Sequence, residues 1–168
     1  LPCLHLIARV FPQAERFLLT NLPVNKWNPT ISLILGNSAL VNGYINYSYR
    51  ISDIKGLYQL CKKIKQWTPD ILVYLPGQRN YLRIIRDALF FKTCGIKRII
   101  GIPYSKDLQT NRFLSDKSYF EQEAVRLARC LSVLGDAKLS EASSWDLLLS
   151  PQENLDAQRA LQGWAGRN

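Results

Sequence analysis

The sequence predicts an α/β domain of three layers with a mostly parallel sheet, a Rossmann-like arrangement. Short apolar runs of strand length alternate several times with longer segments whose apolar residues recur at helical spacing. The clearest case lies between Asp70 and Gly101, where an apolar run at 71–75 precedes a helical segment and a second apolar run at Ile99 and Ile100. A strand that is apolar throughout is typical of a parallel sheet covered on both faces. Strand, helix and strand in this order form a βαβ unit with a right-handed crossover.

Composition limits the partners that we expect. The 168 residues suit one domain, and 47% hydrophobic residues can build a core. The net charge of +9 favours anionic partners, namely nucleic acid, phosphorylated sugars or an anionic membrane surface. The basic residues are scattered and no nucleic-acid-binding motif occurs, so we do not expect nucleic acid. The chain holds no Met, and we expect it to be a piece of a longer protein.

The cysteines are too widely spaced for a zinc site. Cys3, Cys61, Cys94 and Cys130 form no C-x-x-C pair, and His5 is the single histidine. We therefore expect free, buried thiols in a reducing compartment, and no metal or other cofactor. No run of 18 apolar residues and no signal-peptide pattern occurs, which favours a cytoplasmic protein.

The first half of the chain predicts two helices and two strands around one ambiguous segment. A helix fills the first ten residues and ends at Phe11-Pro12, and a strand follows at 16–20. The apolar run at 31–35 fits either a strand or a helix. Period-two alternation at 44–49 predicts a strand, at an edge or in antiparallel pairing. Ser52 or Asp53 caps the next helix. That helix ends near Trp67, with an apolar face of Ile54, Leu57, Cys61 and Ile64.

The second half continues the alternation. The helix after the 71–75 strand ends just before Gly95. A polar loop at 102–117 is either a functional lid or poorly ordered. The capping box at 118–121 opens a helix that stops at Gly135, and 146–149 is a short strand. A second capping box at 150–153 opens the last helix, which carries Leu155, Leu161 and Trp164.

The polar face of the helix after residue 75 is the best candidate for a binding site. Arg79, Arg83 and Arg86 share this face, because they stand four and three residues apart. The helix begins beyond the carboxyl end of a strand, where open α/β sheets bind ligands. An anion near Gly77 and Gln78 meets backbone N–H groups, the positive helix end and guanidinium groups. A solvated basic face is the alternative interpretation.

No complete catalytic constellation is evident. The common phosphate-binding, nucleophile-elbow and zinc-protease motifs are all missing from the sequence. Asp87 follows Arg83 by four residues and is expected to pair with it. Asp107 and Asp116 are acidic loop residues that can face a cleft or simply be solvated. His5 has no nucleophile elbow to serve.

Several short segments follow one another in a consistent order along residues 1 to 150. They are 1–12 (LPCLHLIARVFP), 18–21 (LLTN), 35–38 (LGNS), 70–75 (DILVYL), 86–91 (RDALFF) and 94–101 (CGIKRIIG). Together they resemble the N-terminal domain of the heptosyltransferase-like glycosyltransferases, family 9. The resemblance implies one half of a GT-B enzyme, in which two Rossmann-like domains face each other across a cleft. It implies an inverting transfer of a sugar, typically heptose from ADP-heptose, to a lipopolysaccharide-type or other glycan acceptor.

The same resemblance implies which functions this chain carries and which belong to other parts of a longer enzyme. Residues 1–150 are the acceptor-binding domain without its first strand, and 151–168 is a linker helix toward a donor domain. The nucleotide-sugar donor binds that second domain, and the catalytic aspartate precedes Leu1, so this piece is inactive by itself. Partners are a glycan or glycolipid acceptor and the anionic inner-membrane surface, where the protein is peripheral. The acceptor-binding residues implied by the resemblance and the residue pattern together are Asn21, Asn37, Gln78, Arg79, Arg83 and Arg86. The rival hypothesis is a non-catalytic α/β module that binds a phosphorylated ligand or a partner protein.

Overall fold

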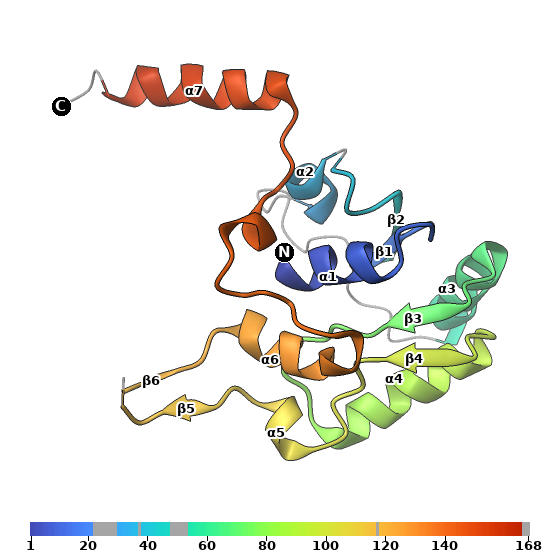
Figure 1. The fold of residues 1–168 in the computed structure, drawn as a ribbon. Coiled ribbons are helices and arrows are strands. Elements are labelled where there is room, and N and C mark those ends of the chain that lie inside the picture. The colour runs from blue at the N-terminus through green and yellow to red at the C-terminus, as the bar shows by residue number, and fades with distance from the viewer. Residues whose placement is uncertain (22–29, 37, 48–53, 117, 166–168) are drawn as a thin grey trace.

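The structure is a computed structural model of the chain, and it describes residues 1–21, 30–36, 38–47, 54–116 and 118–165. Helices and short strands alternate through it, which confirms the mixed α/β class (Figure 1). The elements are α1 (Pro2–Val10), β1 (Phe17–Asn21), α2 (Ile31–Leu35), β2 (Gly43–Tyr47), α3 (Ile54–Trp67), β3 (Ile71–Val73), α4 (Tyr81–Thr93), β4 (Arg98–Ile100), α5 (Lys106–Gln109), β5 (Phe113–Leu114), β6 (Tyr119–Phe120), α6 (Glu123–Cys130), the 3₁₀ turns η1 (Ser132–Leu134) and η2 (Ala142–Trp145), and α7 (Pro151–Ala165).

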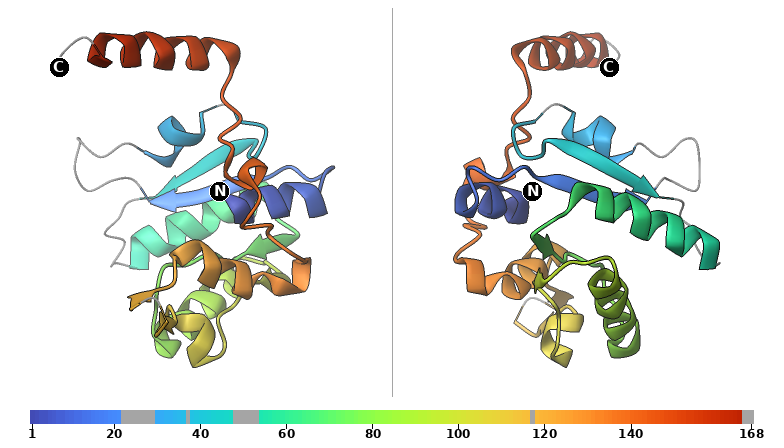
Figure 2. Two further views of the ribbon diagram at one scale, coloured as in Figure 1. Left: turned by 60° about the vertical axis from the view of Figure 1, so that its left-hand side comes forward. Right: turned by 90° about the vertical axis from the view of Figure 1, so that its right-hand side faces the viewer.

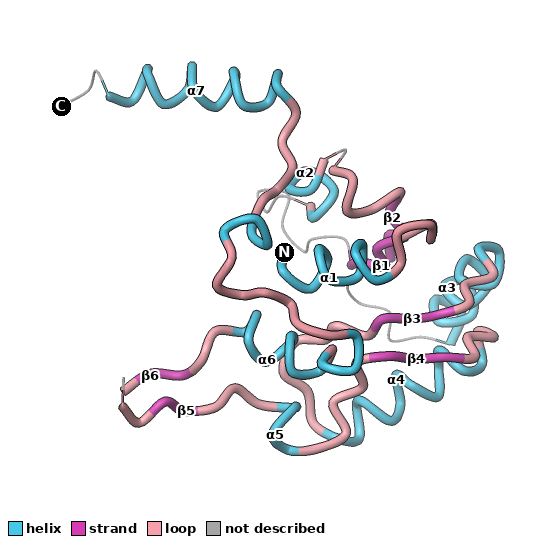
Figure 3. Tube along the Cα trace, viewed as in Figure 1, coloured by secondary structure: helices cyan, strands magenta, loops and turns pink. Residues whose placement is uncertain are grey.

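The described strands form three separate pairs. β1 pairs with β2 and β3 with β4, both in parallel, whereas β5 and β6 form an antiparallel pair. Figure 2 shows that the β1–β2 pair runs in a different direction from the β3–β4 pair, and Figure 3 shows how short the strands are. The parallel pairing is confirmed, and it excludes antiparallel pairing of the 44–49 segment with β1. A continuous Rossmann-like sheet is not confirmed and stays a prediction.

The β3–α4–β4 unit follows the sequence prediction closely. Leu72 lies opposite Ile99 in the register of the pair, and the Tyr74 N–H extends the ladder by donating to the Ile100 carbonyl at 2.7 Å. α4 begins after Asn80, whose side-chain oxygen accepts from the backbone N–H of Arg83 at 3.1 Å. The helix ends before Gly95, as predicted, and Gly95 adopts a φ of +93°.

Helices cover both faces of the β3–β4 pair. On one face, Ile71 and Val73 pack against a cluster of buried residues. It consists of Cys3 and Leu6 of α1, Ile100 of β4, and Leu131 and Ala137, which follow α6. On the other face, Leu72 and Ile99 pack against a cluster of Leu60, Ile64, Cys94 and Ile96, from α3 and the end of α4. Successive strand residues therefore face opposite layers, as the continuous apolar run predicted.

The apolar face predicted for α3 is partly wrong. Leu60 and Ile64 are the buried residues of this helix, whereas Ile54 is 87% exposed and Leu57 is also exposed. The exposed residues stand in the first turn of α3, and the buried ones come later in the helix. The proposed caps at Ser52 and Asp53 lie outside the described residues.

Three local predictions after β4 are wrong. The 102–117 segment is not an irregular loop, because it forms α5 and the first strand of the β5–β6 hairpin. The 118–121 segment is no capping box, since α6 begins only at Glu123 and the Glu121 carboxylate accepts hydrogen bonds from elsewhere. The 146–149 segment pairs with no strand among the described residues.

The remaining predictions of helices are confirmed, and the ambiguous 31–35 segment is the helix α2. The second capping box is real, because the Ser150 N–H donates to Glu153 Oε2 at 2.7 Å and the Glu153 N–H to Ser150 Oγ at 3.2 Å. α7 then extends away from the rest of the molecule (Figures 1 and 2), and its Leu155 and Leu161 are exposed. None of the described helices has the length and apolar character needed to cross a bilayer.

Candidate functional site

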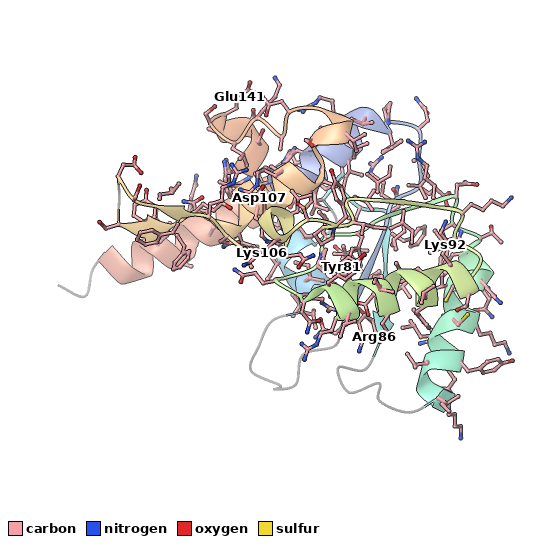
Figure 4. All side chains as sticks on the ribbon, turned by 90° about the horizontal axis from the view of Figure 1, so that it is seen from below. Tyr81, Arg86, Lys92, Lys106, Asp107 and Glu141 are labelled. Atoms are coloured by element: carbon pink, nitrogen blue, oxygen red, sulfur yellow. The ribbon has the colours of Figure 1, made fainter. Side chains whose placement is uncertain are left out.

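The candidate site lies where β3 and β4 end. Parallel strands bring their carboxyl ends to one edge, and there the 74–80 loop leads into α4 while the 101–105 loop leads into α5. Figures 1 and 4 show α5, which carries Lys106 and Asp107, beside the first turn of α4. Two loops and two helix starts therefore border this edge.

Asp87 of α4 gathers the polar groups of the edge. Its Oδ2 accepts from the Tyr74 hydroxyl at 2.7 Å and pairs with Arg79, and its Oδ1 accepts from Arg86 Nη2 at 2.7 Å and Nε at 3.1 Å. The side chain of Asp87 is only 14% exposed. The predicted Asp87–Arg83 pair is wrong, because Arg79 and Arg86 already occupy both carboxylate oxygens.

The cluster keeps an excess of positive charge. Arg79 and Arg86 bring two guanidinium groups to the one carboxylate of Asp87, and the exposed Arg83 adds a third positive charge on α4. Burial and the hydrogen bond to Asp87 raise the pKa of Tyr74, so its hydroxyl stays a donor. The side chains of Arg79 and Arg86 are 36% and 69% exposed, which leaves N–H groups of both available to a ligand.

The other predicted site residues divide into three groups. Gln78 and Arg83 are exposed on the same loop and helix as Arg79 and Arg86. Asn21 ends β1 in the other strand pair, and no hydrogen bond or ion pair joins it to the arginines within the described ranges. Asn37 lies outside the described residues. The structure thus brings four of the six residues to one edge and leaves Asn21 apart from them.

A buried arginine that the sequence did not single out holds this edge together. Arg126 of α6 is 0% exposed, and its guanidinium donates to the Pro76 carbonyl at 2.6 Å, to the Leu108 carbonyl at 2.8 Å and to the Glu123 carboxylate. It therefore ties the loop after β3 to α5. The only signal in the sequence is Glu123 three residues earlier, which is equally typical of a solvated helix face.

A second group of ion pairs fastens the β5–β6 hairpin to α6. The Glu121 carboxylate, which is buried, pairs with Arg129 and accepts from the Arg112 N–H at 2.9 Å. The Arg112 guanidinium binds Asp107 through two bonds of 2.7 and 2.8 Å. Asp107 is thus committed to an ion pair, while Asp116 is exposed on the hairpin turn. Neither carboxylate is paired with another one in the manner of an acid–base couple.

These carboxylates should make stability depend on acid. Burial alone would raise the pKa of Glu121, but the bonds from Arg129 and from the Arg112 N–H outweigh burial and lower it below 4.5. When the pKa of a carboxyl group is lower in the folded protein than in the unfolded chain, its ionised form stabilises the fold. This stabilisation is complete at a pH above the pKa of the unfolded chain, and it is lost as the pH falls through the pKa of the folded protein. We therefore expect the free energy of unfolding to decrease when the pH is lowered below about 4.5.

Denaturant unfolding at a series of pH values tests this expectation. Glu121→Gln should be less stable at pH 7 and should show a shallower loss in acid. Some loss should remain, because the bond from Arg112 also lowers the pKa of Asp107. An acid slope unchanged by Glu121→Gln would contradict the assignment.

The histidine and the possible metal ligands do not form a second site in the described part of the chain. His5 Nε2 donates to the Asp146 carbonyl at 2.7 Å, which fixes the ring to a structural role between α1 and the segment before α7. No group of three or more His, Cys, Asp or Glu side chains gathers as a metal site in the described part of the chain. What the edge can do chemically is bind negative charge.

The comparisons with known proteins give no family. No family model, curated protein or solved structure matches the chain. The heptosyltransferase-like assignment consequently depends on the order of short sequence segments alone.

Proposed function

We propose that the edge formed by Gln78, Arg79, Arg83 and Arg86 binds the phosphate of a sugar-sized ligand. On this proposal the chain is the acceptor-binding part of an inverting GT-B-type glycosyltransferase, which transfers a sugar from a nucleotide sugar to a glycan. The observation that carries it is the pair of guanidinium groups on Asp87, exposed beside the end of a parallel strand. A net charge of +9 agrees with an anionic ligand.

The binding chemistry follows from the donors of the edge. A phosphate oxygen competes with the Asp87 carboxylate for Arg79 and Arg86, and a guanidinium presents two parallel N–H groups to such an oxygen pair. The exposed Gln78 amide lies on the same loop and can bond a sugar hydroxyl. In the proposed enzyme this edge contributes position, because holding the acceptor in place removes the entropy cost of the encounter. The base and the donor site belong to parts of the proposed enzyme outside residues 1–168.

The second candidate is a non-catalytic module that binds a phosphorylated ligand. It is favoured by the chemistry of the edge itself, since Asp87 and Asp107 are both held by arginines there and neither is placed to abstract a proton. The two candidates share the binding site and differ only in turnover.

Binding can be tested on this chain with inorganic phosphate and a hexose phosphate as probes. Arg79→Ala and Arg86→Ala should each weaken binding roughly three- to tenfold, the value of a charge-assisted hydrogen bond at an exposed site. Asp87→Asn should strengthen binding, because it removes the carboxylate that competes for both arginines. Arg98→Ala is the matched control, since it removes an exposed arginine at the opposite end of β4.

The outcomes separate the candidates. Equal weakening by Arg98→Ala and Arg86→Ala would mean that only the overall charge attracts the anion, and it would overturn the site. In the full-length protein, loss of acceptor affinity with nearly unchanged kcat upon Arg86→Ala supports the acceptor role. Phosphate binding without any turnover of a nucleotide sugar supports the non-catalytic module.

A further inference from the structure

Two cysteines from different elements meet on the far side of the β3–β4 pair. Cys61 lies on α3, and Cys94 follows the last residue of α4. Cys61 Sγ lies 3.9 Å from the carbonyl oxygen of Thr93, the residue before Cys94, and the Cys61 thiol is near enough to raise the pKa of Cys94. α3 and α4 contact each other, and Figures 1 and 4 show both helices at the same corner of the molecule.

The two thiols differ in access. Cys94 is 2% exposed within the cluster of Leu60, Ile64 and Ile96, whereas Cys61 is half-buried at its border. A small reagent therefore reaches Cys61 first. A mixed disulfide on Cys61 would then stand beside a second thiol that solvent does not reach.

The surroundings of Cys61 favour a negatively charged reagent. Cys61 lines a shallow hollow together with Tyr58, Lys62, Lys65 and Gln66. α3 carries four lysines and no acidic residue from Ile54 to Trp67. The positive charge of the hollow raises the local concentration of small anions.

We propose that Cys61 is a site of thiolation by an anionic low-molecular-weight disulfide of the glutathione type, with Cys94 as the resolving cysteine. The Cys61 thiolate attacks one sulfur of the reagent RSSR, so that the Cys61–SR bond forms and one RS⁻ leaves. The Cys94 thiolate then attacks the Cys61 sulfur, which forms the Cys61–Cys94 disulfide and expels the second RS⁻. Two protein thiols are oxidised, one reagent disulfide is reduced to two thiols, and the two protons pass to the leaving thiolates.

The order of the two steps has an electrostatic reason. Burial, and then the neighbouring Cys61 thiol, raise the pKa of Cys94 to about 12, so Cys94 does not start the exchange. Thiolation of Cys61 removes the contribution of that thiol, whereas Lys65, which lowers the pKa of Cys94, stays. The first step thereby makes the second one easier.

The chain contains its own control pair. Cys3 and Cys130 are 6% and 7% exposed, and Cys130 is near enough to contribute to the raised pKa of Cys3. Burial is the main cause that raises the pKa of both. With no accessible member, this pair should not react while the fold is intact.

Peptide mass mapping of the native chain tests the proposal. Incubation with oxidised glutathione, acid quenching and alkylation should yield a Cys61–Cys94 disulfide peptide, with Cys3 and Cys130 alkylated. Cys94→Ala should accumulate the glutathione adduct on Cys61. At low salt, glutathione disulfide should react about fivefold faster than the cationic disulfide cystamine. This ratio corresponds to about 1 kcal/mol, the size of the interaction between the charge of the reagent and a nearby lysine charge in water. Lys62→Gln with Lys65→Gln should remove this preference, as should high salt.

Several results would overturn the proposal. Reaction of Cys3 or Cys130 at the rate of Cys61 would mean that access to Cys61 is not special. A stable Cys61 adduct in the chain with Cys94 present would exclude Cys94 as the resolving residue, and this measurement needs no variant. Equal rates with glutathione disulfide and cystamine would exclude the role of the lysines. Circular dichroism of Cys94→Ala checks that its adduct forms on the folded protein.

Discussion

Arg126→Met is expected to lower the free energy of unfolding by about 2–4 kcal/mol, because two backbone carbonyls that a fully buried guanidinium satisfies would lose their donor. Arg126 is 0% exposed, and its removal leaves the Pro76 and Leu108 carbonyls and the Glu123 carboxylate without their donor. The 74–80 loop and α5 would lose the side chain that joins them. Urea unfolding followed by circular dichroism measures the change.

Two further variants separate the guanidinium from its charge. Arg126→Lys keeps the charge, but a lysine ammonium lacks the planar set of N–H groups that bonds Pro76, Leu108 and Glu123 together. We therefore expect a loss of stability intermediate between the wild type and Arg126→Met. Arg159→Met removes an exposed ion pair on α7, 73% exposed at the arginine, and should change stability by less than about 0.5 kcal/mol. Equal effects of Arg126→Met and Arg159→Met would show that Arg126 holds nothing in place.

Gly101→Ala is expected to cost about 2–5 kcal/mol, the sum of left-handed backbone strain and overpacking. Gly101 follows β4 with a φ of +85°, and an added Cβ would lie 2.8 Å from Leu131 Cδ2 and 2.9 Å from the Tyr74 carbonyl oxygen. The Leu131 side chain can shift only into the buried cluster that it shares with Leu6 and Ile100. Tyr74 directly follows β3, and its carbonyl cannot move without disturbing the loop that carries Arg79.

Two other glycines divide this cost into its parts. Gly95 has a φ of +93° but nothing within 4 Å of an added Cβ, so Gly95→Ala should show the backbone strain alone, about 1–2 kcal/mol. Gly77 has neither a positive φ nor a neighbour within 4 Å, and Gly77→Ala should be neutral within about 0.5 kcal/mol. Thermal unfolding should show the largest loss of stability for Gly101→Ala, a smaller loss for Gly95→Ala and the smallest for Gly77→Ala. A Gly101→Ala variant no less stable than Gly95→Ala would contradict the close approach of β3 to this glycine.

Both residues support the proposed binding edge without touching a ligand. Arg126 fixes the carbonyl of Pro76, and Gly101 lets the Tyr74 backbone come close. Milder variants at these positions should therefore weaken phosphate binding through the position of the loop. The strict dependence on guanidinium charge belongs to Arg79 and Arg86.

Local sequence signals settled the elements whose ends and faces are encoded within a few residues. The apolar spacing of α1 and α4, the positive φ at Gly95 and the reciprocal bonds of the 150–153 capping box are all local. The capping box predicted at 118–121 failed for the opposite reason. The Glu121 carboxylate that would complete it is held instead by Arg112 and Arg129, from other segments.

The sequence by itself determined the alternation of helices and strands, the parallel βαβ unit and the placing of Gln78, Arg79, Arg83 and Arg86 at one edge, because spacing along the chain is enough for each of these. Only the tertiary structure decided that Asp87 binds Arg79 and Arg86, that Arg126 is buried, and that Cys61 meets Cys94. The physical reason is that a charged or sulfur-bearing side chain has no periodicity of its own. Its partner is chosen by which backbone groups and carboxylates the folded chain brings within bonding distance.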